Sequence, residues 1–178
     1  MKRALKLDQS LFKEVEEDES ANSQALVVLL ITALCTTIGI YLTGLTKEEG
    51  GMYILLLGLA VSVIGWMLLL FIIYILGSTL FGTKRTDVVF LSLFRTVTFA
   101  ASPGVLRFFI FLPALGLLLD IAAQLWCITG MIIALRSIFD FSTGRATALC
   151  IAGWIIYSVL IFGFLKLLGV NIVLPPNN

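Results

Sequence analysis

Three charged side chains stand inside otherwise apolar stretches of this sequence: Arg95, Arg107 and Asp120. Charged groups are costly inside a bilayer, so each of them is a candidate functional residue. Arg107 precedes Pro113 by six residues, and Asp120 follows Ala114 by six. If this Pro-Ala pair is the turn of a hairpin, the two charges reach the same depth on opposing arms. We therefore predict an ion pair between Arg107 and Asp120.

Two interpretations of these charges stay open. In the first, the pair neutralises two buried charges and holds its segment in place. In the second, Arg95, Arg107 and Asp120 form a polar site for a lipid headgroup or a solute. Arg95 also lies in a polar stripe with Ser92 and Thr96, which would face water, phosphates or a second charged patch.

That second patch consists of Arg136, Asp140 and Arg145. Arg136 and Asp140 are four residues apart near a predicted helix end, so we expect them to pair on one face. One role for the patch is anchoring to lipid headgroups by snorkelling side chains. The competing role is docking of a cytoplasmic partner.

Several chemistries have no candidate residues here. The sequence has no histidine, which excludes histidine-based proton transfer and histidine-ligated metal sites. Cys35, Cys127 and Cys150 lie in apolar segments at spacings that fit no metal site or disulfide. Motifs for nucleophilic serine or phosphate-binding loops are absent, and only one acid lies inside a membrane segment. We expect a protein that is not an enzyme and has no cofactor.

The composition places the chain in a membrane. Of its 178 residues, 60% are hydrophobic and 13% are charged, and the mean hydropathy is +1.07. Soluble domains are about half apolar and about a quarter charged. The net charge of +1 gives no reason to expect nucleic-acid binding.

A membrane-crossing helix needs about 20 mostly apolar residues. Five segments of the chain are apolar enough, and we predict an all-α polytopic bundle of about five transmembrane segments. The third is broken at Ser102-Pro103-Gly104, and broken backbone is tolerated at membrane depth only where protein or water satisfies it. We expect it to pack against other helices, with its first half shallow. The segments are residues 25–45, 52–81, 88–112, 117–139 and 146–168.

Small residues recur at helical spacing in three segments, which allows close helix packing in lipid. We expect the three stripes to face one another in the core, the alternative being that they line a pathway. The stripes are Gly58, Ser62 and Gly65; Gly116, Ala123, Cys127, Gly130, Ala134 and Ser137; and Ala146, Cys150 and Gly153.

The flanking charges predict the orientation. With five crossings and a cytoplasmic N-terminus, eight Lys and Arg residues fall inside and only Lys47 and Lys166 fall outside. This distribution follows the positive-inside rule. If residues 88–112 were re-entrant, Arg136 and Arg145 would fall outside, which the rule disfavours.

The chain divides into three parts. Residues 1–24 lack the features of a secretory signal and form a cytoplasmic, amphipathic and acidic segment. Its apolar residues Ala4, Leu7, Leu11 and Val15 predict a helix lying on the inner leaflet, the alternative being a partly ordered tail. Residues 25–168 form the transmembrane domain, and residues 169–178 a short non-cytoplasmic tail.

Several stretches resemble the Yip1-domain family of multi-pass membrane proteins, in its short prokaryotic type. Residues 94–104, FRTVTFAASPG, resemble the family's LR-x-x-x-F-A-x-x-P-G stretch, and residues 112–116, LPALG, its P-x-L-G turn. Residues 133–146 look like its inner loop before the last helix, and Gly153-Trp154 continues the match. The resemblance covers nearly the whole chain.

The resemblance implies five helices, a cytoplasmic N-terminus and, for short members, a prokaryotic cytoplasmic membrane. Eukaryotic relatives act in vesicle traffic and bind prenylated Rab-type GTPases and one another. This chain lacks their long N-terminal region, so a small GTPase is a doubtful partner. A membrane-protein partner or a homo-oligomer is the expected alternative, besides the lipid bilayer itself.

We therefore carry two functional hypotheses. The first is a non-enzymatic membrane scaffold or adaptor acting through Arg136, Asp140 and Arg145, in membrane organisation or trafficking. The second is a small transport or lipid-handling protein with its polar site at Arg95, Arg107 and Asp120. The second requires a cavity that reaches Asp120, and a dry helical core there would exclude it.

Overall fold

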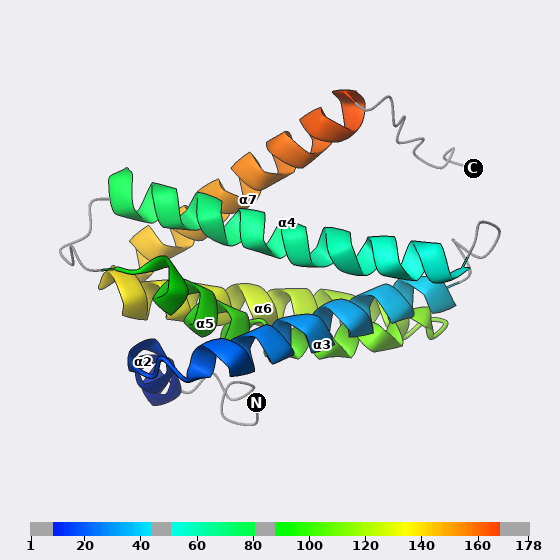
Figure 1. Ribbon diagram of the computed structural model, residues 1–178, viewed down its shortest axis with the longest axis horizontal. Coiled ribbons are helices and arrows are strands. Elements are labelled where there is room, and N and C mark those ends of the chain that lie inside the picture. The colour runs from blue at the N-terminus through cyan, green and yellow to red at the C-terminus, as the bar shows by residue number, and fades with distance from the viewer. Residues whose placement is uncertain (1–8, 44–50, 81–87, 168–178) are drawn as a thin grey trace.

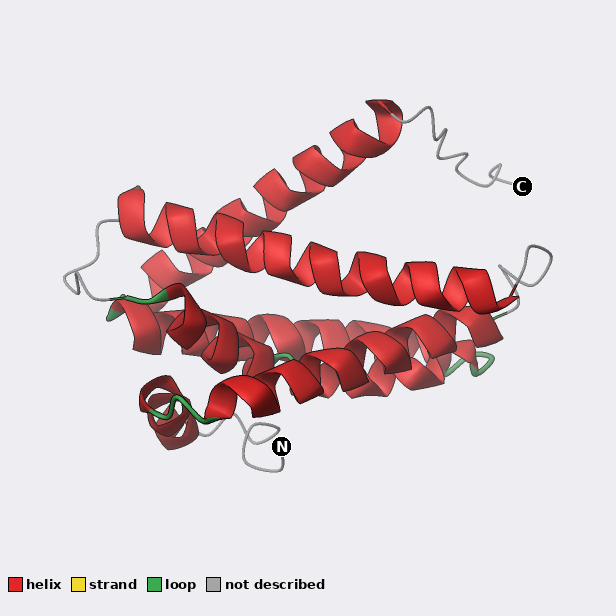
Figure 2. Ribbon diagram, viewed as in Figure 1, coloured by secondary structure: helices red, strands yellow, loops and turns green. Residues whose placement is uncertain are grey.

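The computed structural model describes residues 9–43, 51–80 and 88–167, and all regular structure in these ranges is helical. Figure 2 shows long helices joined by short connections. An all-α bundle, as the sequence predicts, is therefore confirmed. The elements are α2 (Gln9–Glu17), α3 (Ala21–Leu42), α4 (Gly51–Thr79), α5 (Phe90–Ala100), the 3₁₀ helix η1 (Ser102–Phe111), α6 (Gly116–Phe139) and α7 (Thr143–Leu167).

Four of the described helices, α3, α4, α6 and α7, are long and apolar enough to cross a membrane. A fifth candidate span consists of α5 and η1, which meet at an angle of 46°. In Figure 1, α5 begins at the end of the bundle where α4 stops, and η1 leads to the opposite end, where α6 begins. The bent pair therefore runs the length of the bundle, antiparallel to α4 and α6 and parallel to α3, on which it also packs.

The predicted break in residues 88–112 is confirmed at Ala101, between α5 and η1. All side chains of α5 from Ser92 to Ala100 are buried, and η1 packs mainly against α3 and α6. The expectation that this segment is covered by other helices is thus correct. Burial matters because irregular backbone inside a membrane needs protein or water around it.

Two glycines let η1 approach its neighbours closely. A Cβ atom at Gly39 of α3 would lie 2.3 Å from the carbonyl oxygen of Arg107, and one at Gly116 would lie 2.0 Å from that of Ile110. Gly116 follows a tight turn in which Ala114 has a φ of 63°. Both positions require glycine because any larger side chain would push η1 away.

The stripes of small residues only partly meet as expected. Glycines of the α4 and α7 stripes do lie in the interface between these helices. Gly65 packs against Tyr157 and Gly153 against Ile73, so each meets a large side chain and not the opposite stripe. Gly58, however, packs against Thr37 of α3. The α6 stripe faces the bent segment, through Gly116 and η1, rather than α4. The prediction of a single three-stripe core is wrong, because α6 packs on η1 and α5 and makes no comparable contact with α4.

The N-terminal helix is also placed differently from the prediction. Phe12 and Val15 of α2 are buried in the protein core, since α2 packs on α5 and α6. Its apolar face therefore covers protein, and the expectation of a helix on the inner leaflet is corrected. Ala4 and Leu7, which the prediction also used, lie outside the described residues.

Candidate functional site

The predicted ion pair between Arg107 and Asp120 is confirmed. Arg107 Nε donates to Asp120 Oδ1 at 2.8 Å, and Arg107 Nη2 donates to Gln124 Oε1 at 2.9 Å. Protein covers most of both side chains, leaving exposed fractions of 34% for Arg107 and 26% for Asp120. One cation on η1 thus holds two side chains of α6, and the rigid α6 fixes the direction of the guanidinium.

Arg95 does not join this cluster, and the expectation of a three-residue site is wrong. Its side chain is 7% exposed. Nε donates to the carbonyl oxygen of Val15 at 2.8 Å, Nη2 to that of Glu16, and Nη1 to Asn22 Oδ1 at 3.4 Å. Arg95 therefore holds the C-terminal end of α2, where unpaired carbonyls and the helix dipole favour a cation. It faces neither water nor the Arg136 patch.

A cavity of about 220 Å³ lies beside Arg107 and Gln124. Residues from α3, α4, α5, η1, α6 and α7 line it, close to the middle of each long helix and at the break between α5 and η1. The lining is mostly apolar, and the cavity is partly open. Its polar residues are Thr32, Thr36, Ser62, Thr98, Arg107 and Gln124, and its aromatic residues are Trp66, Trp154 and Tyr157.

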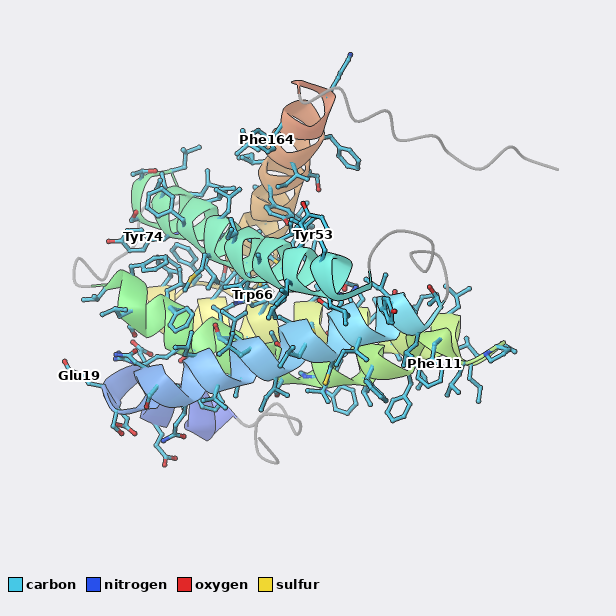
Figure 3. The ribbon with its side chains drawn as sticks, turned by 45° about the vertical axis from the view of Figure 1, so that its right-hand side comes forward. Glu19, Tyr53, Trp66, Tyr74, Phe111 and Phe164 are labelled. Atoms are coloured by element: carbon cyan, nitrogen blue, oxygen red, sulfur yellow. The ribbon has the colours of Figure 1, made fainter. Side chains whose placement is uncertain are left out.

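Figure 3 shows Trp66 on the side of α4 that faces the lower helices of the bundle. Its Nε1 donates to Thr98 Oγ1 at 3.1 Å, so this indole is fully paired. The second cavity indole is different: Trp154 Nε1 is buried, and no acceptor for it exists among the described residues. Unpaired buried donors are rare in proteins. The described residues hold three more unpaired buried side-chain atoms, Thr37 Oγ1, Ser102 Oγ and Ser137 Oγ, but these three residues do not line the cavity.

The Arg136, Asp140 and Arg145 patch exists as an exposed surface, since all three residues are exposed. The expected Arg136–Asp140 pair is wrong, because the described residues show no ion pair between them. Asp140 ends α6 in a left-handed conformation with a φ of 52°, which takes its side chain off the helical face. Arg136 Nη1 instead lies 3.4 Å from Thr143 Oγ1.

The three cysteines are free thiols. Cys127 Sγ donates to the carbonyl oxygen of Ala101 at 3.5 Å, and Cys150 Sγ lies 3.5 Å from Met131 Sδ. In the part of the chain that the structure describes, no cluster of three or more His, Cys, Asp or Glu residues could hold a metal ion.

Sequence reasoning missed Gln124, Trp66, Trp154 and Tyr157. For Gln124 a signal exists: it is a polar residue four positions after Asp120, hence on the same face of α6. The aromatic residues carry no such signal. In a membrane helix an aromatic that faces lipid and one that faces a cavity look alike in sequence.

Comparison with known proteins gives one match. The family model described as the Yip1 domain matches residues 9–171, nearly the whole chain. Neither the curated proteins nor the solved structures contain a match. The matched range includes the bent segment, the Arg107–Asp120 pair and every residue that lines the cavity. The chain therefore belongs to the Yip1-domain family of membrane proteins.

Proposed function

We propose that this protein is a non-enzymatic integral membrane protein that binds a membrane lipid or a small solute inside its helix bundle. The observation that carries this proposal is the cavity beside the Arg107–Asp120 pair. Of the two hypotheses from the sequence, lipid handling or transport required a cavity that reaches Asp120. This cavity is lined by Arg107, the partner of Asp120, and not by Asp120 itself. The scaffold hypothesis did not require a cavity.

The position of the cavity supports this function. It lies at the break between α5 and η1, and Ala101 and Gly104 of the break line it. Non-helical backbone at membrane depth occurs where it is buried or lines a cavity, and broken helices form many transporter binding sites. η1 is also unusual, because it has 10 residues whereas 3₁₀ runs seldom exceed about four.

A purely structural role for the Arg107–Asp120 pair explains less of the site. Arg107 and Asp120 neutralise each other and fix η1 on α6, as a purely structural pair would. A structural pair does not, however, need an adjoining cavity or an unpaired indole donor such as Trp154 Nε1. Filling this space with apolar side chains would stabilise the fold, since voids in a packed core are costly.

Native mass spectrometry of the protein, extracted with its surrounding lipid, tests the proposal. We expect one retained membrane molecule per chain. The variant Ser62→Leu places a larger side chain in the cavity and should lose that molecule. Val61→Leu is the matched control, because Val61 is on the same helix and 59% exposed.

An unoccupied parent protein would contradict the proposal. So would a molecule that both Ser62→Leu and Val61→Leu retain equally, since that molecule would sit on the outer surface of the bundle.

A scaffold or adaptor is the second candidate function, and the exposed patch favours it. Among the described residues Arg136 has no carboxylate partner, so Arg136 and Arg145 present two exposed cations at one end of the bundle. An adaptor should be crosslinked to one stoichiometric partner in native membranes. Arg136→Glu with Arg145→Glu should release that partner. If the protein is crosslinked only to other copies of itself, the result counts against this role.

We also propose a cytoplasmic N-terminus and an external C-terminus, in a prokaryotic cytoplasmic membrane. The charge distribution supports this orientation, because α2 with Lys13, the end of α6 with Arg136 and the start of α7 with Arg145 share one end of the bundle (Figure 1). The resemblance to prokaryotic members of the family supports the prokaryotic membrane.

A further inference from the structure

We propose that the cavity receives the carbonyl group of an uncharged membrane amphiphile, whose tail remains in the bilayer. This inference rests on the proposed function and names its ligand class. It follows from three properties of the cavity: the hydrogen-bonding capacity of its lining, its charge balance, and its size relative to its opening.

The hydrogen-bonding groups still free at the cavity are mainly donors. Trp154 Nε1 is a buried donor without a partner among the described residues, and indole N–H can only donate. Arg107 uses Nε and Nη2 for its two hydrogen bonds, and Gln124 accepts one of them through Oε1. That leaves Arg107 Nη1 and the Gln124 amide nitrogen, which are donors, and the Tyr157 and Ser62 hydroxyls, which can donate or accept. A ligand that satisfies them must bring acceptor oxygens.

The charge balance selects an uncharged acceptor. Arg107 is already paired with Asp120 at 2.8 Å, so the cluster has no net charge to neutralise an anion. Bringing a second negative group beside Asp120 would add repulsion and a desolvation cost in a site with little water. A carbonyl oxygen accepts hydrogen bonds from the same donors without that cost.

The size of the cavity selects a ligand that is only partly inside. A cavity of about 150 Å³ holds benzene, and this one has about 220 Å³. It therefore accepts a ring or an ester group but not a whole lipid. It is lined by Ser62, Gly65 and Trp66 of α4 and by Trp154 and Tyr157 of α7. Beyond the contact of Gly65 with Tyr157, α4 and α7 diverge (Figure 1). Because the cavity is partly open, a tail attached to the bound group can extend out of it.

Two kinds of membrane molecule carry such a carbonyl: an isoprenoid quinone and a neutral glycerolipid ester. The cavity tryptophans can distinguish them. The chain has three tryptophans, and Trp66 and Trp154 line the cavity, whereas Trp126 is 38% exposed. In the full-length variant Trp126→Phe, the indole emission therefore comes from the cavity alone. The double variant Trp66→Phe with Trp154→Phe keeps only Trp126, so its emission reports on the bulk bilayer.

The probes are decylubiquinone, dioleoylglycerol and dodecyl phosphate, each added to the Trp126→Phe protein in nanodiscs of dialkyl-ether phosphatidylcholine, whose lipids carry no carbonyl group. We expect saturable quenching by decylubiquinone or a saturable emission shift with dioleoylglycerol. The probe that saturates identifies the quinone or the glycerolipid source. Dodecyl phosphate is anionic and lacks a carbonyl, so it should not saturate. The bulk reporter should respond linearly to every probe.

A donor deletion tests the hydrogen-bond argument. Tyr157→Phe in the Trp126→Phe background should weaken binding by about 3- to 10-fold, the equivalent of one lost hydrogen bond. Tyr53→Phe is the control, because Tyr53 is 69% exposed on α4 (Figure 3). Equal affinity of the Tyr157→Phe and Tyr53→Phe proteins would overturn the assignment.

The remaining outcomes separate this inference from the function on which it rests. Saturation by dodecyl phosphate alone would overturn the carbonyl assignment and leave a lipid-binding cavity. If no probe saturates but native mass spectrometry still shows a retained molecule, the carbonyl assignment is likewise overturned and the proposed function stands. If no molecule is retained either, both proposals are wrong.

Discussion

Arg95 and Arg107 are two buried or half-buried guanidinium groups of one membrane protein, and their charges are satisfied differently. Arg107 is paired with the Asp120 carboxylate and the Gln124 amide. Arg95 is held by the main-chain carbonyls that end α2 and by Asn22. The first arrangement leaves donors facing a cavity, whereas the second uses its donors within the fold. Of the two, only Arg107 lines the cavity.

Removing the carboxylate should destabilise the protein. Asp120→Ala leaves the Arg107 cation with one neutral acceptor, so we expect a loss of about 2 kcal/mol of unfolding free energy. Asp120→Asn should lose less, because it keeps an acceptor oxygen. Thermal unfolding in mild detergent measures the difference.

The double variant Asp120→Ala with Arg107→Met is the control, and it should recover part of the loss because no uncompensated charge remains. Equal stability of parent, Asp120→Asn and Asp120→Ala proteins would show that the pair does not contribute.

At the scale of elements, the bent segment explains most of the arrangement. Its break at Ser102-Pro103-Gly104 is visible in the sequence, and so is the equal spacing of Arg107 and Asp120 from the turn that joins η1 to α6. Hydrophobicity and breaker residues are local signals, so the helices and this pair could be predicted. The partners of Arg95 could not, since they belong to a helix about 80 positions earlier in the chain. The same holds for the cavity, which six elements enclose.

Close contact between α3 and η1 can be tested at a glycine. Gly39→Ala would place a Cβ atom 2.3 Å from the Arg107 carbonyl oxygen, so η1 must shift. We expect a loss of about 1–3 kcal/mol, as for other overpacked sites, measured by thermal unfolding. Gly163→Ala is the matched control on α7, where no heavy atom lies within 4 Å of the added Cβ. Equal stability of the two variants would contradict the packing described for η1.

The docking of α2 depends on Arg95. Lysine carries the same charge as a compact group and cannot serve several acceptors in a fork geometry. Arg95→Lys should therefore loosen α2, and we expect its backbone amides to exchange with deuterium at least about 10-fold faster. Arg136→Lys, at an exposed position, should leave this exchange unchanged. Unchanged exchange in the Arg95→Lys protein would show that α2 is held by Phe12 and Val15 alone.

At the scale of the whole molecule, the number of crossings decides the orientation of the C-terminal half. Four helices can span the membrane, or five spans result if α5 and η1 count as one. Five crossings place α2 and the end of α7 on opposite sides. This choice cannot come from local sequence, because neither α5 nor η1 is long enough to span alone.

Labelling of single cysteines tests the orientation. In a protein with Cys35, Cys127 and Cys150 replaced by alanine, Lys166→Cys should react with an impermeant maleimide in intact cells. Glu19→Cys should react only after permeabilisation. Reaction of both positions from the same side would mean that the bent segment does not cross, and the charge-based orientation would be wrong.

The central claim is that the cavity beside Arg107 and Asp120 holds a membrane molecule. The most direct measurement is a crystal structure of the protein grown from a lipid mesophase after extraction from its native membrane. We predict non-protein density in the cavity within hydrogen-bonding distance of Arg107, continuing through the cavity's opening into the bilayer. A cavity that contains only water, or that side chains have closed, would contradict the account.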